Sequence, residues 1–263
     1  MKIFILRQRV KSIYINRRML WDMSSSQLKA KYAGLKLGAW WVIIIPLTMA
    51  LCINFIFVLV FKVNIPNYLF FILSGIFPWF FISQAISEVT NVFIVNRSML
   101  RQGVFPREFI PLASILSNFI NFILGFAIII PLFILINKSL GYLFPLFILI
   151  ALLNLVFVLG LGLIFAVLNS FLRDISYFLS VGMMFWFWVT PVFYSENMLS
   201  FPYRWICLIN PVTHFISAYH KVLYSGKFLS GSDIFILFSI SSVTLILGYI
   251  FYLNNEAEIL KKI

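Results

Sequence analysis

The histidines and cysteines are the side chains best suited to bind a metal ion or to act as nucleophiles. His214 and His220 lie six residues apart, so on a helix they would project from different faces. Each is better interpreted as a polar residue near a membrane interface than as a ligand. Cys52 and Cys207 fall in a long apolar stretch and in a later loop, where packing is a simpler role than a disulfide or a metal site. The sequence therefore predicts no metal site and no cofactor.

The carboxylates are the next candidates for chemistry, but all of them lie at or beyond the ends of the long uncharged stretches. They are Asp22, Glu88, Glu108, Asp174, Glu196, Asp233, Glu256 and Glu258. An ion-coupled carrier normally keeps ionisable side chains deep in the bilayer, and an intramembrane glycan-lipid transferase needs clustered carboxylates or a metal at one membrane face. The sequence also contains no G-x-x-x-x-G-K-[ST] motif for binding ATP. We predict a conduit that is not an enzyme and that takes its energy from another subunit.

Aromatic rings and three asparagines are the remaining groups that could bind a ligand. The rings gather in two stretches, around Trp79 and Phe80 and around Trp186 and Phe187. Most single rings are explained by lipid-facing packing and interfacial belts; the alternative is a path lined by rings, which would suit the apolar faces of sugars. The asparagines are expected at mid-span depth, where they should face the bundle interior or a cavity rather than lipid. They are Asn118, Asn121 and Asn154.

The elements that position these residues are predicted to be transmembrane helices. The chain is 62% hydrophobic and 11% charged, whereas a soluble domain has about a quarter of its residues charged. Six uncharged stretches are each long enough for one crossing, which takes about 20 apolar residues. The predicted fold is an all-α membrane protein with six spans at residues 37–61, 67–90, 107–136, 144–170, 175–194 and 234–253.

The distribution of basic residues predicts the orientation of the chain. With six spans, 15 of the Lys and Arg residues lie on the side of both termini and 5 on the other side. The positive-inside rule places the larger group, and therefore both termini, in the cytoplasm. This asymmetry explains the net charge of +12 through contact with membrane lipids and without nucleic acid.

The N-terminal tail, residues 1–36, is predicted to carry an amphipathic helix on the inner membrane surface. Apolar residues recur there at helical spacing. They are Ile3, Leu6, Val10, Ile13, Tyr14 and Trp21. Residues 256–263 form the second cytoplasmic tail.

Two connecting segments are predicted to be helical as well. Asn96 is a good N-cap and Gly103 a good stop, so residues 97–102 should form a short cytoplasmic helix, either docked on a partner or a solvated connector. The outer segment 195–233 is apolar but has no run long enough to span. Asn210 and Pro211 predict the start of a helix within it, and Gly226 its end. A re-entrant helical hairpin of this kind is either a gate or a cap.

Several short motifs in order along nearly the whole chain carry a resemblance to a known family. They lie at residues 28–32, 37–41, 77–81, 96–100, 105–108, 173–175, 190–194 and 210–213. In these motifs the chain resembles the membrane permease subunits of ABC transporters that export O-antigen, teichoic acid or related lipid-linked polysaccharides.

The resemblance implies a homodimer in a bacterial cytoplasmic (inner) membrane, paired with two copies of a separate P-loop ATPase. It makes the short helix a coupling helix, comprising Asn96, Arg97, Ser98, Met99, Leu100, Arg101 and Gln102. The path of the lipid-linked glycan would pass Trp79, Phe80, Asn118, Asn121, Asn154, Trp186 and Phe187. The outer gate would comprise Tyr194, Asn210, Pro211 and Thr213. Export of a drug or a simple lipid is the alternative within the same superfamily.

Overall fold

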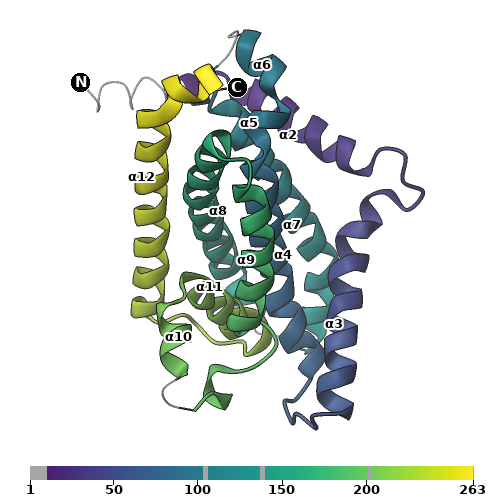
Figure 1. The fold of residues 1–263 in the computed structure, drawn as a ribbon. Helices are drawn as coiled ribbons and strands as arrows, with labels where there is room; N and C mark the ends of the chain where they lie inside the picture. Colours follow the sequence, from purple (N-terminus) through teal and green to yellow (C-terminus); the bar gives the residue numbers. More distant parts are fainter. Residues whose placement is uncertain (1–10, 103–105, 137–139, 201–202, 263) are drawn as a thin grey trace.

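The computed structural model describes residues 11–102, 106–136, 140–200 and 203–262. Helices and the turns between them make up these residues, and no β-strand occurs among them. Long helices run side by side in a bundle, while α2 (Arg17–Tyr32) and α6 (Arg97–Gln102) lie at the end where the chain also terminates (Figure 1). The bundle has two ends that we call the α6 end and the α11 end.

Five helices are long and apolar enough to cross a membrane. They are α3 (Trp41–Leu59, preceded by a 3-10 turn at Gly38–Trp40), α4 (Tyr68–Thr90), α7 (Phe109–Ile136), α8 (Leu140–Phe171) and α12 (Gly231–Lys262). Each corresponds to one of the predicted spans, and α12 continues nine residues past residue 253 into the predicted tail. A sixth apolar helix, α9 (Ile175–Val189), is shorter.

The early end of α9 has a local cause. The prediction placed a span over 175–194, but the helix stops at Val189 and Thr190 adopts an extended backbone with φ −89° and ψ 133°. Pro191 follows directly, and the ring of a proline disfavours the helical conformation of the residue before it. The helix therefore ends at Val189, five residues before the predicted end at residue 194.

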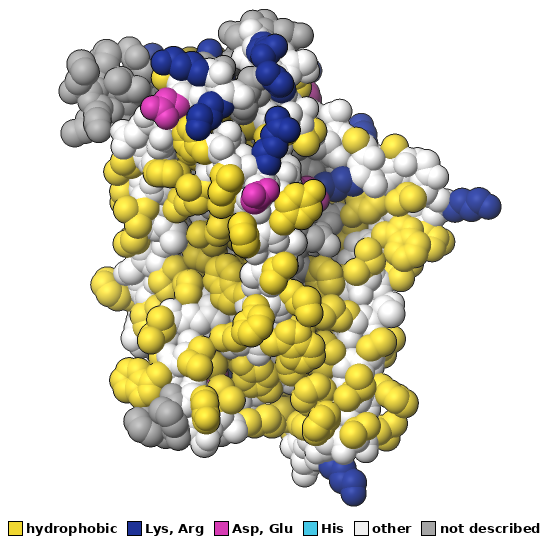
Figure 2. Space-filling model, in the orientation of Figure 1, with side chains coloured by type: hydrophobic (Ala, Val, Ile, Leu, Met, Phe, Trp, Pro, Cys, Tyr) yellow, Lys and Arg dark blue, Asp and Glu magenta, His cyan; other side chains and the backbone are white. Residues whose placement is uncertain are grey.

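Helix α4 forms the centre of the bundle. In its most apolar window 72% of the residues are buried, compared with 17% in α3 and 17% in α12. The two outer helices consequently present most of their apolar side chains outward. Figure 2 shows the result as a broad hydrophobic surface over the bundle, with Lys and Arg side chains concentrated at the α6 end.

Helices α8 and α12 approach each other backbone to backbone. A Cβ placed on Gly248 would lie 2.0 Å from the carbonyl oxygen of Gly160, and a Cβ on Gly160 would lie 2.3 Å from the carbonyl of Thr244. Neither helix can bear a side chain at its glycine without moving away. The two glycines thus allow a close crossing of the kind found where small residues face each other in membrane bundles.

Helix α2 packs on the start of α7 at the α6 end. Leu20 is buried against Phe109 and Ala113, with Ile13 and Met23 beside them. Tyr14, just before α2, and Trp21, within it, are exposed. Ile3, Leu6 and Val10 lie outside the described residues. The helix therefore uses one face for the bundle and leaves two large rings for other contacts.

Short elements complete the two ends. At the α6 end, α5 (Val92–Val95) continues from α4 into α6. At the α11 end lie a 3-10 turn (Glu196–Met198), α10 (Arg204–Ile209), α11 (Pro211–Tyr219) and a π-helical turn (His220–Tyr224) (Figure 1). The predicted helices at 97–102 and after Asn210 are both present. Gly103, the predicted stop of the first, lies outside the described residues.

Candidate functional site

The α6 helix exposes only part of its predicted docking surface. Arg97, Ser98 and Arg101 are exposed, whereas Leu100 is 2% exposed and packs in the hydrophobic core. Asn96 donates its side-chain amide to the carbonyl of Val92 at 2.8 Å, so it ends α5 rather than capping α6. The side chain of Gln102 lies outside the described residues. The free face of α6 is therefore polar and basic, and Leu100 is part of what anchors it.

Met99 and Asn96 face a groove between α2 and α6 that we call the α2 groove. The groove has a volume of about 650 Å³. Its α2 wall combines apolar and polar side chains, among them Met19 and Met23 with Arg18 and Asp22. The position of Met99 in this groove leaves it accessible from the α6 end, in contrast to Leu100.

A polar triangle fastens the end of α2 to α4 and α7. The Lys31 ammonium lies 2.8 Å from the Glu88 carboxylate and donates to the Asn118 side-chain oxygen at 2.8 Å. The Asn118 amide in turn donates to Glu88 at 2.7 Å. Three side chains from three helices thus provide one another's hydrogen-bond and ion-pair partners where α2 meets the bundle. Asn118 is buried and the side chains of Lys31 and Glu88 are 23% and 41% exposed.

Tyr32 and Asn121 extend this polar region by one step. The Tyr32 hydroxyl donates to the Asn121 side-chain oxygen at 2.6 Å. Burial is the main cause that raises the pKa of Tyr32, partly opposed by the bond to Asn121 and reinforced by the negative charge of Glu88. The phenol is therefore neutral and acts as a hydrogen-bond donor.

Three predicted path residues meet in a small pocket beside Tyr32, which we call the amide pocket. Phe80, Asn118 and Asn121 line it together with Gln84 and several further rings. Its volume is about 70 Å³. Amide groups and aromatic rings are thus combined near the α6 end, whereas the asparagines were predicted at mid-span depth, and the space is too small for a sugar ring.

The other aromatic path residues form a cluster between α4 and α9. The Trp79 ring meets Trp186 edge to face with centroids 6.4 Å apart and lies 5.5 Å from the Phe187 ring. Trp79 and Phe187 also line an open apolar pocket of about 300 Å³ with Met49 of α3. Asn154 is in neither group: it is fully buried in α8. The seven predicted path residues therefore fall into three separate places.

Asn210 joins α9, the turn after it and α11. Its side-chain oxygen accepts from the Trp186 indole at 2.8 Å and from the Val212 backbone N–H at 3.1 Å. Its amide donates to the Thr190 hydroxyl at 2.9 Å. Pro211 occupies the first helical position, where its missing N–H costs nothing. The predicted N-cap is confirmed, and the same side chain connects a predicted path residue to the predicted gate helix.

Tyr194 and Thr213, the remaining predicted gate residues, both line a larger hollow at the α11 end that we call the α11 cavity. Its volume is about 500 Å³. The Tyr194 hydroxyl donates to the carbonyl of Val189 at 2.9 Å and so provides a partner for the last carbonyl of α9. Cys207 of α10 also lines the cavity; burial first, and then the nearby Glu196, raise the pKa of its thiol.

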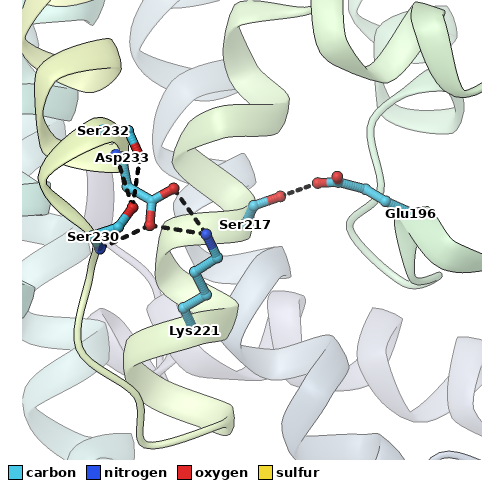
Figure 3. A network of polar contacts seen from close by, with 6 residues as sticks. All are labelled: Glu196, Ser217, Lys221, Ser230, Ser232 and Asp233. Carbon is cyan, nitrogen blue, oxygen red and sulfur yellow. Dashed lines mark hydrogen bonds and ion pairs between the residues drawn. The ribbon is translucent and has the colours of Figure 1, made fainter.

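Charged groups that the sequence did not single out form the polar wall of the α11 cavity. Lys221 of the π-helical turn donates to both carboxylate oxygens of Asp233, at 2.8 and 2.9 Å. On the other side of α11, Ser217 donates to the Glu196 carboxylate (Figure 3). The sequence contained a signal for this group, because Glu196, Lys221 and Asp233 are charged residues in the strongly apolar outer segment 195–233. Their proximity depends on the turn after α11, which the spacing did not predict.

His220 also lines the α11 cavity, next to Lys221. Its ring stacks on Phe71 with centroids 4.0 Å apart, and its two nitrogens contact the Ser74 hydroxyl at 2.8 Å and the Pro191 carbonyl at 3.2 Å. Burial lowers the pKa of His220 to about 4, so the ring is neutral at physiological pH. It thus acts as a hydrogen-bonding link between α4 and the π-helical turn.

Comparisons with known proteins match most of the chain. A model of the ABC-2 type transporter family matches residues 20–224. An O-antigen export system permease protein RfbA of Klebsiella pneumoniae is 34% identical over 206 residues, which cover 78% of this chain and 79% of that protein. The protein of the same name from Myxococcus xanthus is 27% identical over 245 residues, or 90% of this chain and 92% of the relative.

Proposed function

The chain belongs to the ABC-2 type transporter family, and from that premise we propose that it is the permease of a bacterial inner-membrane exporter for a polyprenyl-linked polysaccharide such as O-antigen or teichoic acid. The observation that carries the proposal is the similarity to O-antigen export permeases, which extends over 90% of this chain in one case. The five long apolar helices, together with α9, agree with a multi-pass membrane component.

The proposed topology has six crossings with both termini in the cytoplasm. Helix α9 would be the fifth crossing, although its 15 residues extend only about 22 Å, less than the ~30 Å hydrocarbon core. The extended residues after Val189 and the re-entrant pair α10 and α11 would complete the distance. The gathering of basic side chains at the α6 end supports a cytoplasmic location for that end (Figure 2).

Family membership implies association with an ATPase subunit, and we place its docking surface on α6. The exposed side chains Arg97, Ser98 and Arg101, with Met99 at the edge of the α2 groove, would contact a groove of the ATPase. Leu100 is assigned to anchoring α6 because it is buried. Movement of the ATPase would then reach the bundle through α5 and α4, which continue directly from α6.

We further propose that two copies form the conduit, with α9 at the interface. Its outward face carries large exposed apolar side chains for most of its length. They are Tyr177, Phe178, Val181, Met184, Phe185 and Trp188. A cysteine replacing Phe185 should then form a disulfide-linked dimer in membranes, whereas one replacing Phe235 on the exposed face of α12 should not. Equal cross-linking at both positions would contradict the assignment of the interface.

Deleting the gene tests the proposed function directly. Loss of the chain should remove the polysaccharide from the cell surface and leave lipid-linked polysaccharide in the cytoplasmic leaflet, with both effects reversed by the wild-type gene. The measurement is surface labelling of the glycan together with extraction of the lipid-linked form. Unchanged surface glycan with increased sensitivity to a drug would favour drug export instead.

The coupling surface is tested by reversing its charge. The double variant Arg97→Glu and Ser98→Glu should abolish co-purification of the ATPase and export, because it makes the exposed face of α6 acidic. Lys29→Glu, an exposed substitution on α2, is the control for charge at the same membrane face. Full retention of the ATPase by the double variant would rule out docking at α6.

A further inference from the structure

The α11 cavity is large enough for a small ligand and differs in character from the aromatic cluster. Its volume of about 500 Å³ lies within the range of ligand pockets, roughly 300–1,000 Å³. Its walls come from Phe71 of α4, from the turn after α9, from α10, α11 and the π-helical turn, and from the start of α12. The cavity is thus built within one chain at the end opposite α6.

Thr213 supplies an unused hydrogen-bonding group in this wall. The residue is 2% exposed and lines the cavity, and its hydroxyl has no hydrogen-bond partner within the part of the chain that the structure describes. A buried hydroxyl normally has at least one partner, because losing its hydrogen bonds to water is costly. A ligand or water in the cavity would supply that partner.

The charges in the wall indicate what kind of ligand fits. Two carboxylates, Glu196 and Asp233, stand against one ammonium group, Lys221, and Lys221 is already paired with Asp233 (Figure 3). An anionic group such as a phosphate would therefore be repelled. A neutral ligand rich in hydroxyls would be favoured, since a carboxylate accepts several hydrogen bonds and the serine and threonine hydroxyls can both donate and accept.

Aromatic side chains complete the lining. Phe71, Tyr194 and His214 line the cavity together with the polar groups. Carboxylates and hydroxyls next to aromatic faces form a surface that matches a sugar, whose hydroxyls lie at the rim of a ring with apolar C–H faces. A simple lipid or a flat hydrophobic drug would leave the Thr213 hydroxyl without a partner and would make no hydrogen bond to the Glu196–Ser217 pair.

We propose that the α11 cavity binds a neutral sugar unit of the exported glycan on the outer side of the membrane, with Thr213, Ser217 and Glu196 as its hydrogen-bonding contacts. The inference rests on the proposed function, because the sugar is taken to be part of the transported polysaccharide. Since α11 is both a wall of the cavity and the helix capped by Asn210, an occupied cavity would be in direct contact with the proposed gate.

Protection of a cysteine from modification tests the site in the full-length protein. The background carries Cys52→Ser and Cys207→Ser, which removes both native thiols. Ser225→Cys places a reporter at an exposed position in the cavity lining, and Ser200→Cys places a control at an exposed position of the preceding loop outside it. The probe is the polysaccharide released by mild acid from cells of the strain that carries the gene, added to protein in lipid nanodiscs.

The expected result is that the polysaccharide slows modification of Ser225→Cys by a methanethiosulfonate reagent at least threefold and leaves Ser200→Cys unchanged. Thr213→Val, which keeps the shape of the side chain, should raise the half-protecting concentration about threefold to tenfold, the effect of one lost hydrogen bond. Thr244→Val is the matched control, because that hydroxyl bonds only within its own helix. Inorganic phosphate should give no protection.

Absence of protection, or protection by phosphate alone, would overturn the inference. The deletion experiment distinguishes this failure from failure of the proposed function. Loss of surface glycan on deletion, combined with an unprotected Ser225→Cys, would support the export function and would show that the cavity does not bind the glycan. Retention of surface glycan on deletion would remove the premise for both.

Discussion

Lys31, Glu88 and Asn118 connect the end of α2 to α4 and α7 through contacts with one another. Each side chain contacts both of the others within 2.8 Å. Because the ion pair is partly exposed, its contribution to stability is expected to be modest, at about 1 kcal/mol. Its greater effect is positional, since it fixes α2 against α4 and α7 beside the proposed docking surface.

A double-mutant cycle measures this contact. Lys31→Met and Glu88→Gln should each lower the free energy of unfolding, and the two together should lower it by less than the sum, with a coupling of about 1 kcal/mol. Unfolding in detergent, followed by tryptophan fluorescence, is the measurement. Lys36→Met, an exposed neighbour, should have little effect. Strict additivity would mean that the two charges do not interact in solution.

Asn210 is the residue at the α11 end with the largest expected effect on stability. Asn210→Ala removes an N-cap and two further side-chain hydrogen bonds, to Trp186 and Thr190. We expect a loss of about 2–3 kcal/mol, measured by chemical denaturation. Asn254→Ala, on the exposed face of α12, is the matched control. A loss no greater than that of the control would show that Asn210 does not secure α11.

At the scale of elements, the crossing of α8 and α12 gives the sharpest prediction. Gly160→Ala and Gly248→Ala should each lower the melting temperature and the yield of folded protein, because the added methyl group meets backbone atoms at 2.0–2.3 Å. The matched control is Gly141→Ala near the start of α8, where a Cβ has no heavy atom within 4 Å. That change should be neutral or stabilise the protein by about 0.4–1 kcal/mol. Equal effects at all three glycines would contradict the close crossing.

Helix boundaries were predictable where a local residue set them. Asn210 followed by Pro211 predicted the start of α11, and the run of uncharged residues predicted the spans of α3, α4 and α7 to within a few positions. The end of α9 was not predicted from the same hydropathy, because Pro191 acts on the backbone of Thr190 and not on the apolar content of the segment. Hydropathy gives the extent of an apolar stretch and is insensitive to where the chain turns within it.

Contacts between distant segments were the part of the candidate site that the sequence could not provide. The aromatic pattern drew attention to Trp79, Trp186 and Phe187, and these rings meet, while their role in a glycan path stays a prediction. The acidic residues were dismissed by their position along the chain, yet Glu88 pairs with Lys31 and Asp233 with Lys221. Leu100 was assigned to a partner surface because it is apolar on a short helix, and it is buried. In each case the missing information was which helices are neighbours.

At the scale of the whole molecule, the proposed topology predicts the sides from which single cysteines can be labelled. In the background without native thiols, Ser98→Cys and Lys261→Cys should react with a membrane-impermeant reagent only after the inner membrane is opened. Ser200→Cys should react from the outside in intact spheroplasts. All three positions are exposed in the structure. Labelling of Ser98→Cys and Lys261→Cys from opposite sides would rule out an even number of crossings between them and the proposed orientation.

The glycines at the crossing of α8 and α12 also restrict which helices of the protein can move relative to one another. Sliding α12 by one helical turn, about 5.4 Å, would bring Thr244 or Tyr252 to the place of Gly248, where only a hydrogen atom fits against the carbonyl of Gly160. The two helices therefore cannot slide along each other, and we expect them to move as one rigid unit. ATP-driven movement transmitted through α5 and α4 would therefore leave the relative position of α8 and α12 unchanged.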